Sequence, residues 1–314
     1  MLLTVFTPTY NREKALERTF RSLCAQSSNE FVWLIVDDGS TDGTAANVEE
    51  FKKRANFEIR YEYQENGGKM RAHNKGVNLC DTELFLCLDS DDILVPQSVE
   101  TIIKTWRDHE NSHFCIQGSK ERAGIVAYKG SVIEGTLDDV MEKISQGMDM
   151  EDSIRPFAGA SFSESDVNAG VNTLRGLYLN GFYGETTLVF RTALLKDNLF
   201  PEVEGEKYIP EDYVYDRIDK VAGLIVLPCV ITVCELMDGG YTASVAKLRK
   251  TNPTGWYMYY DQRRHLDSPL LLKYKYICHY IRFCQILGKK MDLPLYQKIV
   301  AFPGVLALMV MDKT

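Results

Sequence analysis

Several familiar signatures are missing from this chain of 314 residues. It has no run of about 18 apolar residues, the length that a transmembrane helix needs, so we expect no membrane span. Its N-terminus, MLLTVFTPTY, lacks a basic region and a small-residue cleavage site, so we expect no signal peptide. The eight cysteines include no CxxC pair, which argues against a zinc site or a disulfide framework and favours reduced thiols. These absences favour a cytoplasmic protein.

Two nucleotide-binding signatures are also absent. No G-x-G-x-x-G follows the first predicted strand, which argues against a dinucleotide-dependent dehydrogenase. No G-x-x-x-x-G-K-[ST] occurs either, so the segment NGGK at 66–69 is not a P-loop. The five histidines show no spacing typical of metal ligands. The histidines are therefore interpreted as surface or core residues.

Charge is distributed unevenly along the sequence. The formal net charge is −8, but residues 247–290 hold ten Lys or Arg against two Asp, a local charge of +8. Residues 291–314 are neutral, so the first 246 residues carry −16. A basic C-terminal segment behind an acidic body suits an anionic partner, such as a membrane surface or a phosphate-bearing acceptor. A solvated basic face explains the same charges.

The first hundred residues alternate between strand-like and helix-like patterns. Strands are predicted over 2–6, 31–36, 57–63 and 83–88, and helices over 14–26, 43–55, 69–80 and 96–109. Such alternation predicts an α/β fold with a mostly parallel sheet, in which ligands bind beyond the carboxyl ends of the strands. Further along, 124–137 is typical of a hairpin, while 186–196 and 223–236 have strand-like composition. The chain from about 247 onward is expected to be helical.

Polar segments follow each of the four predicted strands, so we expect them to meet at one edge of the sheet. The richest is DSDD, where Asp89, Asp91 and Asp92 follow an apolar strand. Hard carboxylate oxygens select Mg²⁺ or Mn²⁺, and such ions use one or two carboxylates beside phosphate and water. An Asp-rich turn that caps the next helix explains the same residues. Asp37 and Asp38, after the second strand, could accept from a nucleoside.

Several of these motifs together resemble one enzyme family. TPTYNRE, IVDDGSTDGT, NGG and LFLCLDSDD stand in the order and at the spacings seen in the family 2 glycosyltransferases with a GT-A fold. The resemblance covers residues 1 to about 110 densely and resumes at GEKYIPEDYVYDRI, residues 205–218, which is similar to the acidic catalytic motif of that family. It implies a GT-A fold, a Rossmann-like sheet flanked by helices.

The resemblance also implies a role for each matching residue. It implies that the donor nucleotide is bound by Pro8, Tyr10, Glu13, Asp38, Lys69, Arg71 and Asp89. It implies that Asp91 ligates the metal, with Asp89 binding ribose or a metal-bound water and Asp92 in support. Asp212 would be the general base, and Glu211 beside it is the alternative.

Two of these assignments have a simpler explanation in the residues themselves. Glu13 could merely open its helix, and two acids after Pro210 are typical of a helix N-terminus, where they complement the helix dipole. The family resemblance favours the catalytic interpretation of Asp212. In such a transfer, a carboxylate accepts the proton of an attacking hydroxyl, and a metal bridging the diphosphate stabilises the leaving group.

The resemblance thus implies a metal-dependent, inverting transferase that uses a UDP-sugar, with Mn²⁺ or Mg²⁺ as cofactor. Its acceptor would be a saccharide, and a lipid-linked one in bacterial surface-polysaccharide assembly is consistent with the family. No nucleic acid is expected among the partners. Two alternatives stay open: a sugar-nucleotide pyrophosphorylase, although its glycine-rich N-terminal loop is missing, and a non-catalytic receiver-type module, although such a module is far shorter.

We expect a catalytic domain over 1–246, with a nucleotide-binding half at 1–110 and an acceptor half at 111–246, followed by a helical basic segment at 247–314. Within that segment, Leu270, Tyr274, Ile277, Ile281 and Cys284 fall on one helical face, with basic residues interspersed. Such helices can lie in a membrane interface, which would place the protein on the cytoplasmic membrane face. A helical appendage packed by itself is the alternative.

Overall fold

The computed structural model describes residues 1–110, 121–150, 152–157, 159, 161–168, 172–235 and 245–311. The chain forms two compact units. The first comprises Met1–Leu199 and Val214–Leu236, and the second comprises Phe200–Tyr213 and Met237–Thr314. Each unit is discontinuous in sequence, because the segment 200–213 leaves the first unit and joins the second. Whether 1–246 and 247–314 behave as separate domains stays a prediction.

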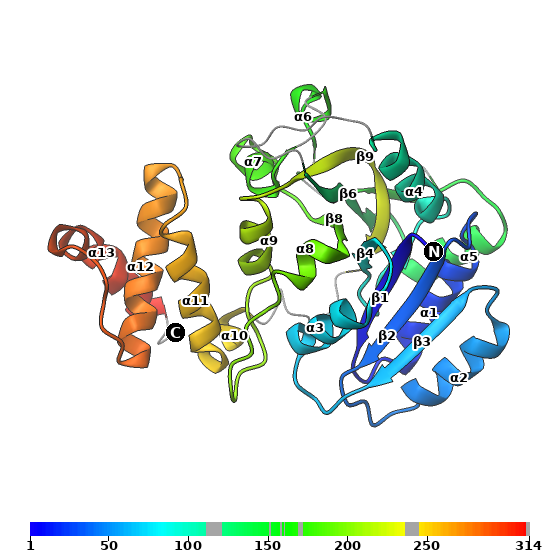
Figure 1. Cartoon of the computed structure of the whole chain (residues 1–314), viewed down its shortest axis with the longest axis horizontal. Helices are drawn as coiled ribbons and strands as arrows, with labels where there is room; N and C mark the ends of the chain where they lie inside the picture. Colours follow the sequence, from blue (N-terminus) through cyan, green and yellow to red (C-terminus); the bar gives the residue numbers. More distant parts are fainter. Residues whose placement is uncertain are drawn as a thin grey trace. The chain divides into compact units, whose positions relative to one another are not determined.

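The first unit begins with the alternation that the sequence predicted. Its elements are β1 (Leu3–Thr9), α1 (Glu13–Cys24), β2 (Phe31–Asp37), α2 (Thr44–Arg54), β3 (Glu58–Tyr63), α3 (Lys69–Leu79), β4 (Leu84–Cys87) and α4 (Ser98–Asp108). The strands lie in the order β3-β2-β1-β4, and all of these neighbours are parallel (Figure 1). Helix connections allow parallel strands to pair, since a crossover needs a dozen or more residues.

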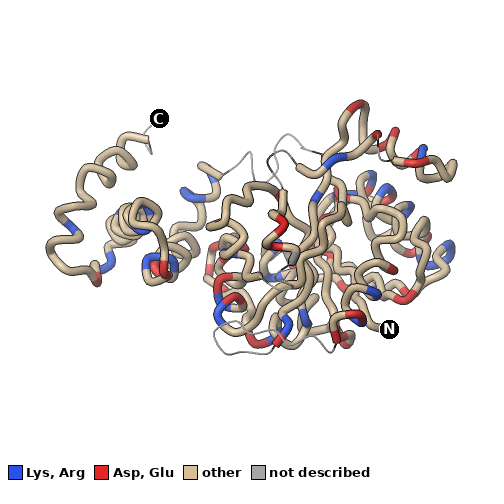
Figure 2. The backbone as a smooth tube through the Cα atoms, turned by 90° about the horizontal axis from the view of Figure 1, so that it is seen from above, with Lys and Arg blue, Asp and Glu red and all other residues tan. Residues whose placement is uncertain are grey.

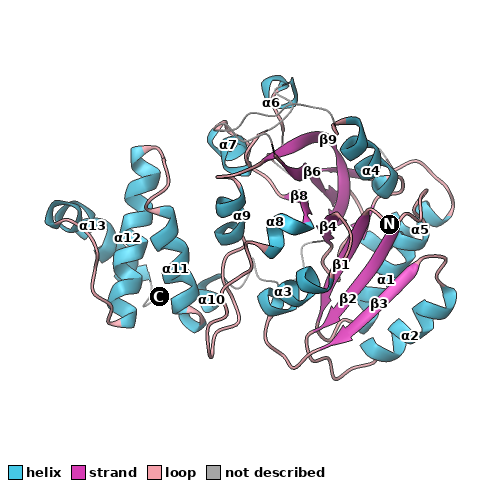
Figure 3. Ribbon diagram, in the orientation of Figure 1, coloured by secondary structure: helices cyan, strands magenta, loops and turns pink. Residues whose placement is uncertain are grey.

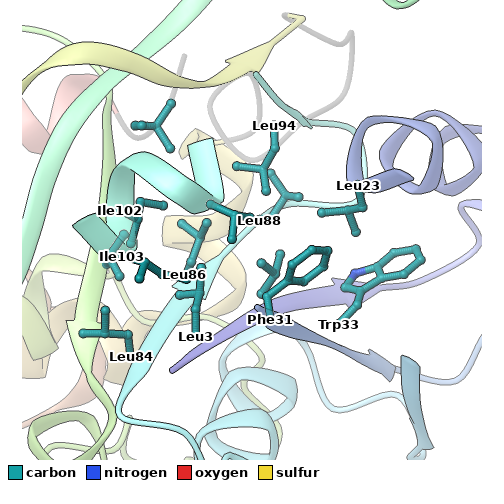
Figure 4. Close-up of a cluster of buried hydrophobic side chains, with 14 of the residues drawn as sticks. Leu3, Leu23, Phe31, Trp33, Leu84, Leu86, Leu88, Leu94, Ile102 and Ile103 are labelled. Carbon is teal, nitrogen blue, oxygen red and sulfur yellow. The ribbon is translucent and has the colours of Figure 1, made fainter. Parts of the chain in front are cut away.

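Strand alternation explains how this half of the sheet is buried on both faces. Leu3 and Val5 of β1 point into a large core formed with the apolar sides of α1, α2 and α4, part of which is drawn in Figure 4. Phe6 points to the opposite face, where its ring stacks on Phe85 and packs under α3. A Cβ on Gly76 of α3 would lie 2.3 Å from the Phe6 ring, so this close packing requires glycine.

The rest of the first unit is mixed. It contains β5 (Ile93–Leu94), β6 (Arg122–Val132), α5 (Leu137–Ser145), β7 (Ile154–Pro156), α6 (Glu164–Asn168), α7 (Leu174–Leu179), β8 (Thr186–Arg191), α8 (Thr192–Lys196) and β9 (Gly223–Cys234). The sheet continues as β4-β8-β6-β9-β5, with β8 antiparallel to β4 and to β6 (Figure 3). The fold prediction is confirmed: an α/β sheet whose first half is parallel, with helices on both faces.

The hairpin predicted over 124–137 is wrong. One long strand, β6, occupies 122–132, and the chain then enters α5. Thr136 and Asp139 form a reciprocal capping box at the start of α5, with Asp139 N donating to Thr136 Oγ1 and Thr136 N donating to Asp139 Oδ2. The turn residues before 137 therefore begin a helix and do not reverse a strand.

The second unit is helical, as predicted. It contains α10 (Val245–Thr251), α11 (Pro253–Arg263), α12 (Leu270–Leu287) and α13 (Leu295–Met311), and α9 (Asp212–Ile218) begins within its 200–213 segment. Aromatic rings form much of its core, with Trp256 and Tyr260 of α11 stacked against Phe283 of α12. Among the described helices, none combines the length and the apolar character that crossing a membrane requires. The described cysteines are free thiols.

Candidate active site

The segments that follow β1, β2, β3 and β4 lie at one edge of the sheet, as the sequence predicted. Asp38 N donates to Thr9 O at 2.8 Å, and Gln64 N donates to Asp37 O at 2.9 Å, so the loops after β1, β2 and β3 start side by side. Leu88 N donates to Phe6 O at 2.8 Å, which brings the loop after β4 beside them. This edge is where ligands bind in open parallel sheets.

The loop after β1 is tied to the loop after β2. Asn11 has a positive φ of 51° and accepts from Thr41 N at 2.8 Å through its side chain. Asparagine tolerates this left-handed conformation better than most residues. Glu13 opens α1, and its carboxylate accepts from Gly43 N at 3.2 Å, while Asp42 accepts from Glu13 N at 3.1 Å. The described contacts of Glu13 therefore organise the two loops.

Asp38 holds the glycine-rich loop after β3. Its two carboxylate oxygens accept from Gln64 Nε2 at 2.7 Å, Asn66 Nδ2 at 3.2 Å, and the backbone amides of Gly67 and Gly68, each at 2.8 Å. The side chain is nearly buried, with 5% of the residue exposed. Gly68 has a φ of 92°, a conformation that glycine adopts without strain. Asp38 thus fixes the shape of this part of the edge.

The other residues assigned to the nucleotide surround this loop. Arg71 of α3 donates to Gly67 O at 3.1 Å, which anchors the guanidinium at the edge. Pro8 is buried near the end of β1, whereas Tyr10 just beyond it is half exposed. Between them, the buried hydroxyl of Thr9 has no hydrogen-bond partner within the described residues. Buried hydroxyls normally find a partner, so this atom is a candidate contact for a ligand.

The acidic loop after β4 is paired with basic side chains. Asp89 forms an ion pair with Lys69, at 2.8 Å between Oδ1 and Nζ. Burial alone raises the pKa of Asp89, but the charges of Lys69 and Lys129 outweigh it and hold the pKa below its ordinary value. Asp89 is therefore ionised at neutral pH, and Lys69, which the resemblance assigned to the nucleotide, lies directly against it.

Asp92 is the deeper member of the loop. Its carboxylate is almost fully buried and lies 2.6 Å from Lys129 Nζ on β6. Burial raises the pKa of Asp92 to about 7, and the charge of Lys129 limits that rise. Burial lowers the pKa of Lys129, but Asp92 and Asp89 raise it more, so its net direction is upward. Lys129 keeps its charge and offsets both carboxylates.

Sequence reasoning missed Lys129. The signal was present, because a lysine inside the apolar run GIVAYKG must find a partner if that run is a buried strand. Its partner could not be read from the sequence, since it lies 37 residues away across the sheet.

Asp91 differs from its two neighbours. Its side chain is 24% exposed, and Arg12 Nη2 stands 3.8 Å from its Oδ2. Among the described residues, no three His, Cys, Asp or Glu side chains gather closely enough to form a metal cage. A single accessible carboxylate flanked by ordered acids still fits Mg²⁺ or Mn²⁺, which complete their shell with phosphate oxygens and water. The residues present therefore fit a metal that binds together with a diphosphate.

Glu211 and Asp212 belong to the second unit, at the start of α9. Asp212 Oδ2 forms an ion pair with Arg263 Nη2 of α11 at 3.0 Å, and 36% of the Asp212 side chain is exposed. Next to it, Gln262 Nε2 donates to Tyr213 O at 2.9 Å. Arg263 was not among the residues singled out from the sequence. The catalytic assignment of Asp212 and Glu211 stays a prediction.

Comparisons with known proteins agree with the fold and with these motifs. The family model for glycosyl transferase family 2 matches residues 4–162, just over half of the chain. The chain belongs to this family, which confirms the resemblance drawn from its motifs. Family membership also favours a transferase over the two alternatives that the sequence left open.

Among curated proteins, the chain is 29% identical over 206 residues to the poly(ribitol-phosphate) beta-N-acetylglucosaminyltransferase TarS of Staphylococcus aureus, covering 64% of this chain and 30% of TarS. It is 36% identical over 106 residues to a validoxylamine A glucosyltransferase of Streptomyces hygroscopicus, covering 32% of this chain and 23% of that protein. An uncharacterised glycosyltransferase of Nostoc matches at 30% identity over 33% of its length. The chain thus spans about a third or less of these relatives.

Solved structures show the same fold. TarS residues 1–349 in complex with UDP-GlcNAc align with a TM-score of 0.56 at 19% identity, over 96% of this chain and 79% of that one. The mannosyltransferase PcManGT of Pyrobaculum calidifontis, in complex with GDP-Man and Mn²⁺, aligns with a TM-score of 0.52 at 16% identity, over 98% of this chain and 80% of that one. At these identities the likeness establishes the fold alone.

Proposed function

We propose that this protein is a metal-dependent, inverting glycosyltransferase that moves a sugar from a UDP-sugar to a hydroxyl of a saccharide acceptor. The observation that carries the proposal is the ordered edge of the sheet, where the clamped loop at Asp38 follows β2 and the acidic loop at Asp91 follows β4, on either side of β1 in a family 2 fold. One loop suits a nucleoside and the other suits a diphosphate with its metal.

The nucleotide would bind along the loops after β1 and β3. Asp38 already shapes the Gly67–Gly68 turn, and its carboxylate would also face the ring N–H of uracil. Tyr10 is exposed enough to pack on the base. Thr9, whose hydroxyl has no partner among the described residues, stands between Tyr10 and the buried Pro8 in the sequence. Arg71 and Lys69 would bring positive charge toward the nucleotide, and Asp89 would meet its ribose.

Asp91 would ligate Mn²⁺ or Mg²⁺, with Asp89 and Asp92 holding the loop in shape through their lysines. When bound, the metal supplies positive charge that stabilises the leaving diphosphate without a proton donor. The ion pairs with Lys69 and Lys129 keep two of the three carboxylates occupied, so the loop presents one ligand to the metal.

Asp212 would act as the general base. A carboxylate within hydrogen-bond reach of the acceptor hydroxyl removes its proton as the oxygen attacks the anomeric carbon, on the face opposite the nucleotide. Metal binding would thus fall to the acidic loop after β4, and proton removal to a second acid far along the sequence. Glu211 is the alternative base.

A thermal-shift panel of nucleotide sugars tests the donor class. UDP-glucose, UDP-N-acetylglucosamine, GDP-mannose and UDP would each be added with Mn²⁺, with Mg²⁺ or with EDTA. At about a hundredfold excess over Kd, a ligand stabilises the native state by about 2.7 kcal/mol, which raises Tm by about 5–10 °C in a domain of this size class. We expect this rise for UDP compounds with metal and little change for GDP-mannose or in EDTA.

The panel also separates the parts of the proposal. An equal rise with and without metal would remove the metal dependence but leave the UDP-sugar assignment standing. A rise with GDP-mannose and none with UDP compounds would replace the donor class.

We further propose that the acceptor is lipid-linked and that the segment 247–314 contacts the membrane. The structure changes which helix would do so. Ile281 and Cys284 of α12, on the face expected to meet lipid, are buried at 4% and 0% exposure. The second half of that face therefore packs against protein, whereas Leu270 at its start is 88% exposed, and we assign the contact to α13 instead.

Helix α13 has an open apolar surface. Leu295, Ile299, Phe302 and Val310 are exposed, and Lys298 is the sole charged residue in the helix. In Figure 2 the helix leading to the C-terminal mark is almost free of charged positions. Exposed lysines at 289 and 290 precede it. An apolar helix with basic residues beside it suits the interface of an anionic bilayer.

Vesicle flotation of the whole chain tests this contact. We expect binding to vesicles that contain phosphatidylglycerol and much less to pure phosphatidylcholine, with loss when Ile299→Asp and Phe302→Asp are combined. Tyr183→Asp in the first unit, at a side chain equally open to solvent, is the matched control. Absence of flotation, or flotation unaffected by the α13 pair, would remove the membrane proposal; concentration-dependent self-association abolished by the same pair would show instead that a second copy covers α13.

A further inference from the structure

The segment that carries the acidic motif is fastened to the beginning of α11. Glu206 accepts from the first free amides of that helix, Thr254 N and Gly255 N, each at 2.8 Å. In return, Asn252 Oδ1 accepts from Lys207 N at 2.7 Å. A Cβ on Gly255 would lie 2.4 Å from Tyr208 O, so the helix and the segment approach too closely for any other residue. Residues 206–208 therefore have little freedom to move away from α11.

The other end of α11 holds the motif itself. Gln262 donates to Tyr213 O at 2.9 Å, and the guanidinium of Arg263 forms its ion pair with Asp212 at 3.0 Å. Arg263 is the last residue of α11. The two ends of α11 thus contact the two ends of the segment 206–213, and all of these contacts lie within the second unit.

Arg263 is itself held in place. Its guanidinium lies 4.7 Å from the ring centre of Tyr259 on α11 and 5.7 Å from that of Tyr276 on α12, and 13% of its side chain is exposed. Cation–π contacts of this kind fix a planar guanidinium and replace part of its lost hydration. The positive charge facing Asp212 is therefore preorganised, unlike that of a mobile surface arginine.

A general base must be ionised and must point at its proton. An opposite charge close to a carboxylate favours the ionised form, commonly by about one to three pKa units. A fixed ion pair also selects one orientation of the carboxylate, and a displacement of about 1 Å at a reacting group can cost about a hundredfold in rate. Both needs are met by an arginine whose guanidinium is held near two tyrosine rings and paired with one carboxylate oxygen.

We propose that Arg263 is the positioning residue of the general base: it orients Asp212 and keeps it ionised, which makes α11 part of the catalytic apparatus. The inference rests on the proposed role of Asp212. Other charged groups also lie near the pair. Glu211 precedes Asp212 and Asp216 follows it on α9, and on α11 Asp261 pairs with Arg264 at 2.8 Å. Glu211 and Asp216 oppose ionisation of Asp212, and Arg263 favours it.

The test measures UDP released from UDP-N-acetylglucosamine with water as acceptor, because attack by water needs the same base. For Arg263→Met we expect kcat to fall by about a hundredfold, with KM for the donor changed less than about twofold. The acidic limb of the kcat–pH profile should move up by about one pH unit or more, because the base loses its cationic neighbour. Arg263→Lys should keep the acidic limb in place while kcat stays lowered, since lysine supplies charge without the planar fork.

Arg264 provides the matched control. It is adjacent, 8% of its side chain is exposed, it pairs with Asp261 and its guanidinium lies 4.2 Å from the ring centre of Tyr280. Arg264→Met should leave the position of the acidic limb unchanged. A profile of Arg263→Met that matches the Arg264→Met profile would overturn the inference. If Arg263→Met does not fold, Arg263→Lys decides: an unaltered kcat overturns the inference and a lowered one with an unmoved limb supports it.

A double variant separates this inference from the proposed function. In an Asp212→Asn background, Arg263→Met should cause no further loss, because its effect passes through Asp212. A further fall in kcat as large as in the wild-type background would mean that Arg263 does not act through Asp212. That result would overturn the inference about Arg263 and leave the proposed function standing. If Asp212→Asn by itself keeps full activity, the proposed base is wrong whatever Arg263 does.

Discussion

Asp212→Asn should lower the rate of UDP-N-acetylglucosamine turnover by a factor of about 10²–10⁴, the usual contribution of a general base. Asparagine keeps the shape of the side chain and can still accept a hydrogen bond from Arg263, but it cannot take a proton. Donor binding should therefore persist, and the metal-dependent rise in Tm with UDP should be within about 1 °C of the wild type. Initial rates and the thermal panel measure the two quantities.

Glu211→Gln is the control for this substitution. It removes one negative charge at the neighbouring position and should lower the rate by less than about tenfold if Asp212 is the base. If Glu211→Gln instead causes the large fall in rate and Asp212→Asn the small one, Glu211 is the base, and the ion pair of Arg263 with Asp212 has another role.

Asp91→Ala should abolish the metal-dependent stabilisation by UDP and reduce turnover to near the background. Asp89 and Asp92 are already paired with lysines at 2.8 and 2.6 Å, so neither is placed to replace the missing ligand. Charge stabilisation by a bound metal is worth several kcal/mol, or about a thousandfold or more in rate. Titration of Mn²⁺ in the presence of UDP, followed by Tm or calorimetry, measures the loss.

Asp81→Ala is a matched control, because Asp81 lies just before β4, at the opposite end of the strand from the acidic loop. It is exposed and pairs with Arg60 at 3.0 Å. Surface pairs contribute about 0–1 kcal/mol, so this variant should bind Mn²⁺ and UDP as the wild type does. Retention of metal-dependent binding by Asp91→Ala would instead assign the metal to other groups.

Most of the parallel half of the fold could be read from the sequence, because three of its strands were mostly apolar and the strand at 57–63 alternated apolar and charged residues. The helices between them showed apolar residues at helical spacing, and turn residues separated the elements. Pattern reasoning failed at 124–137, where the same glycines that suggest a hairpin precede a helix N-cap at Thr136. The order of the mixed strands was also inaccessible. The pairing of β4 with β8 joins residues about a hundred positions apart, and no local signal specifies such a partner.

The candidate site, like the fold, could be predicted from the sequence only in part. The acids at 38, 89, 91 and 92 could be chosen because polar residues at strand ends are conspicuous, but what each one does depends on partners that approach from elsewhere. Lys129 and Arg263 form ion pairs with Asp92 and Asp212, and both looked like ordinary residues of a strand and a helix. Roles that depend on tertiary pairing were therefore out of reach, and those assigned to the site residues here remain proposals.

The contacts of both ends of α11 with residues 206–213 affect the design of chimaeric enzymes of this family. A chimaera that joins the first 246 residues of this chain to the helices of a homologue would keep Glu206 and Asp212 but exchange the amides and the arginine they meet. The graft that respects these contacts moves 200–213 together with the terminal helices, as two inserts in one exchange. Swaps made at a single junction should yield proteins that recognise a donor and leave it intact.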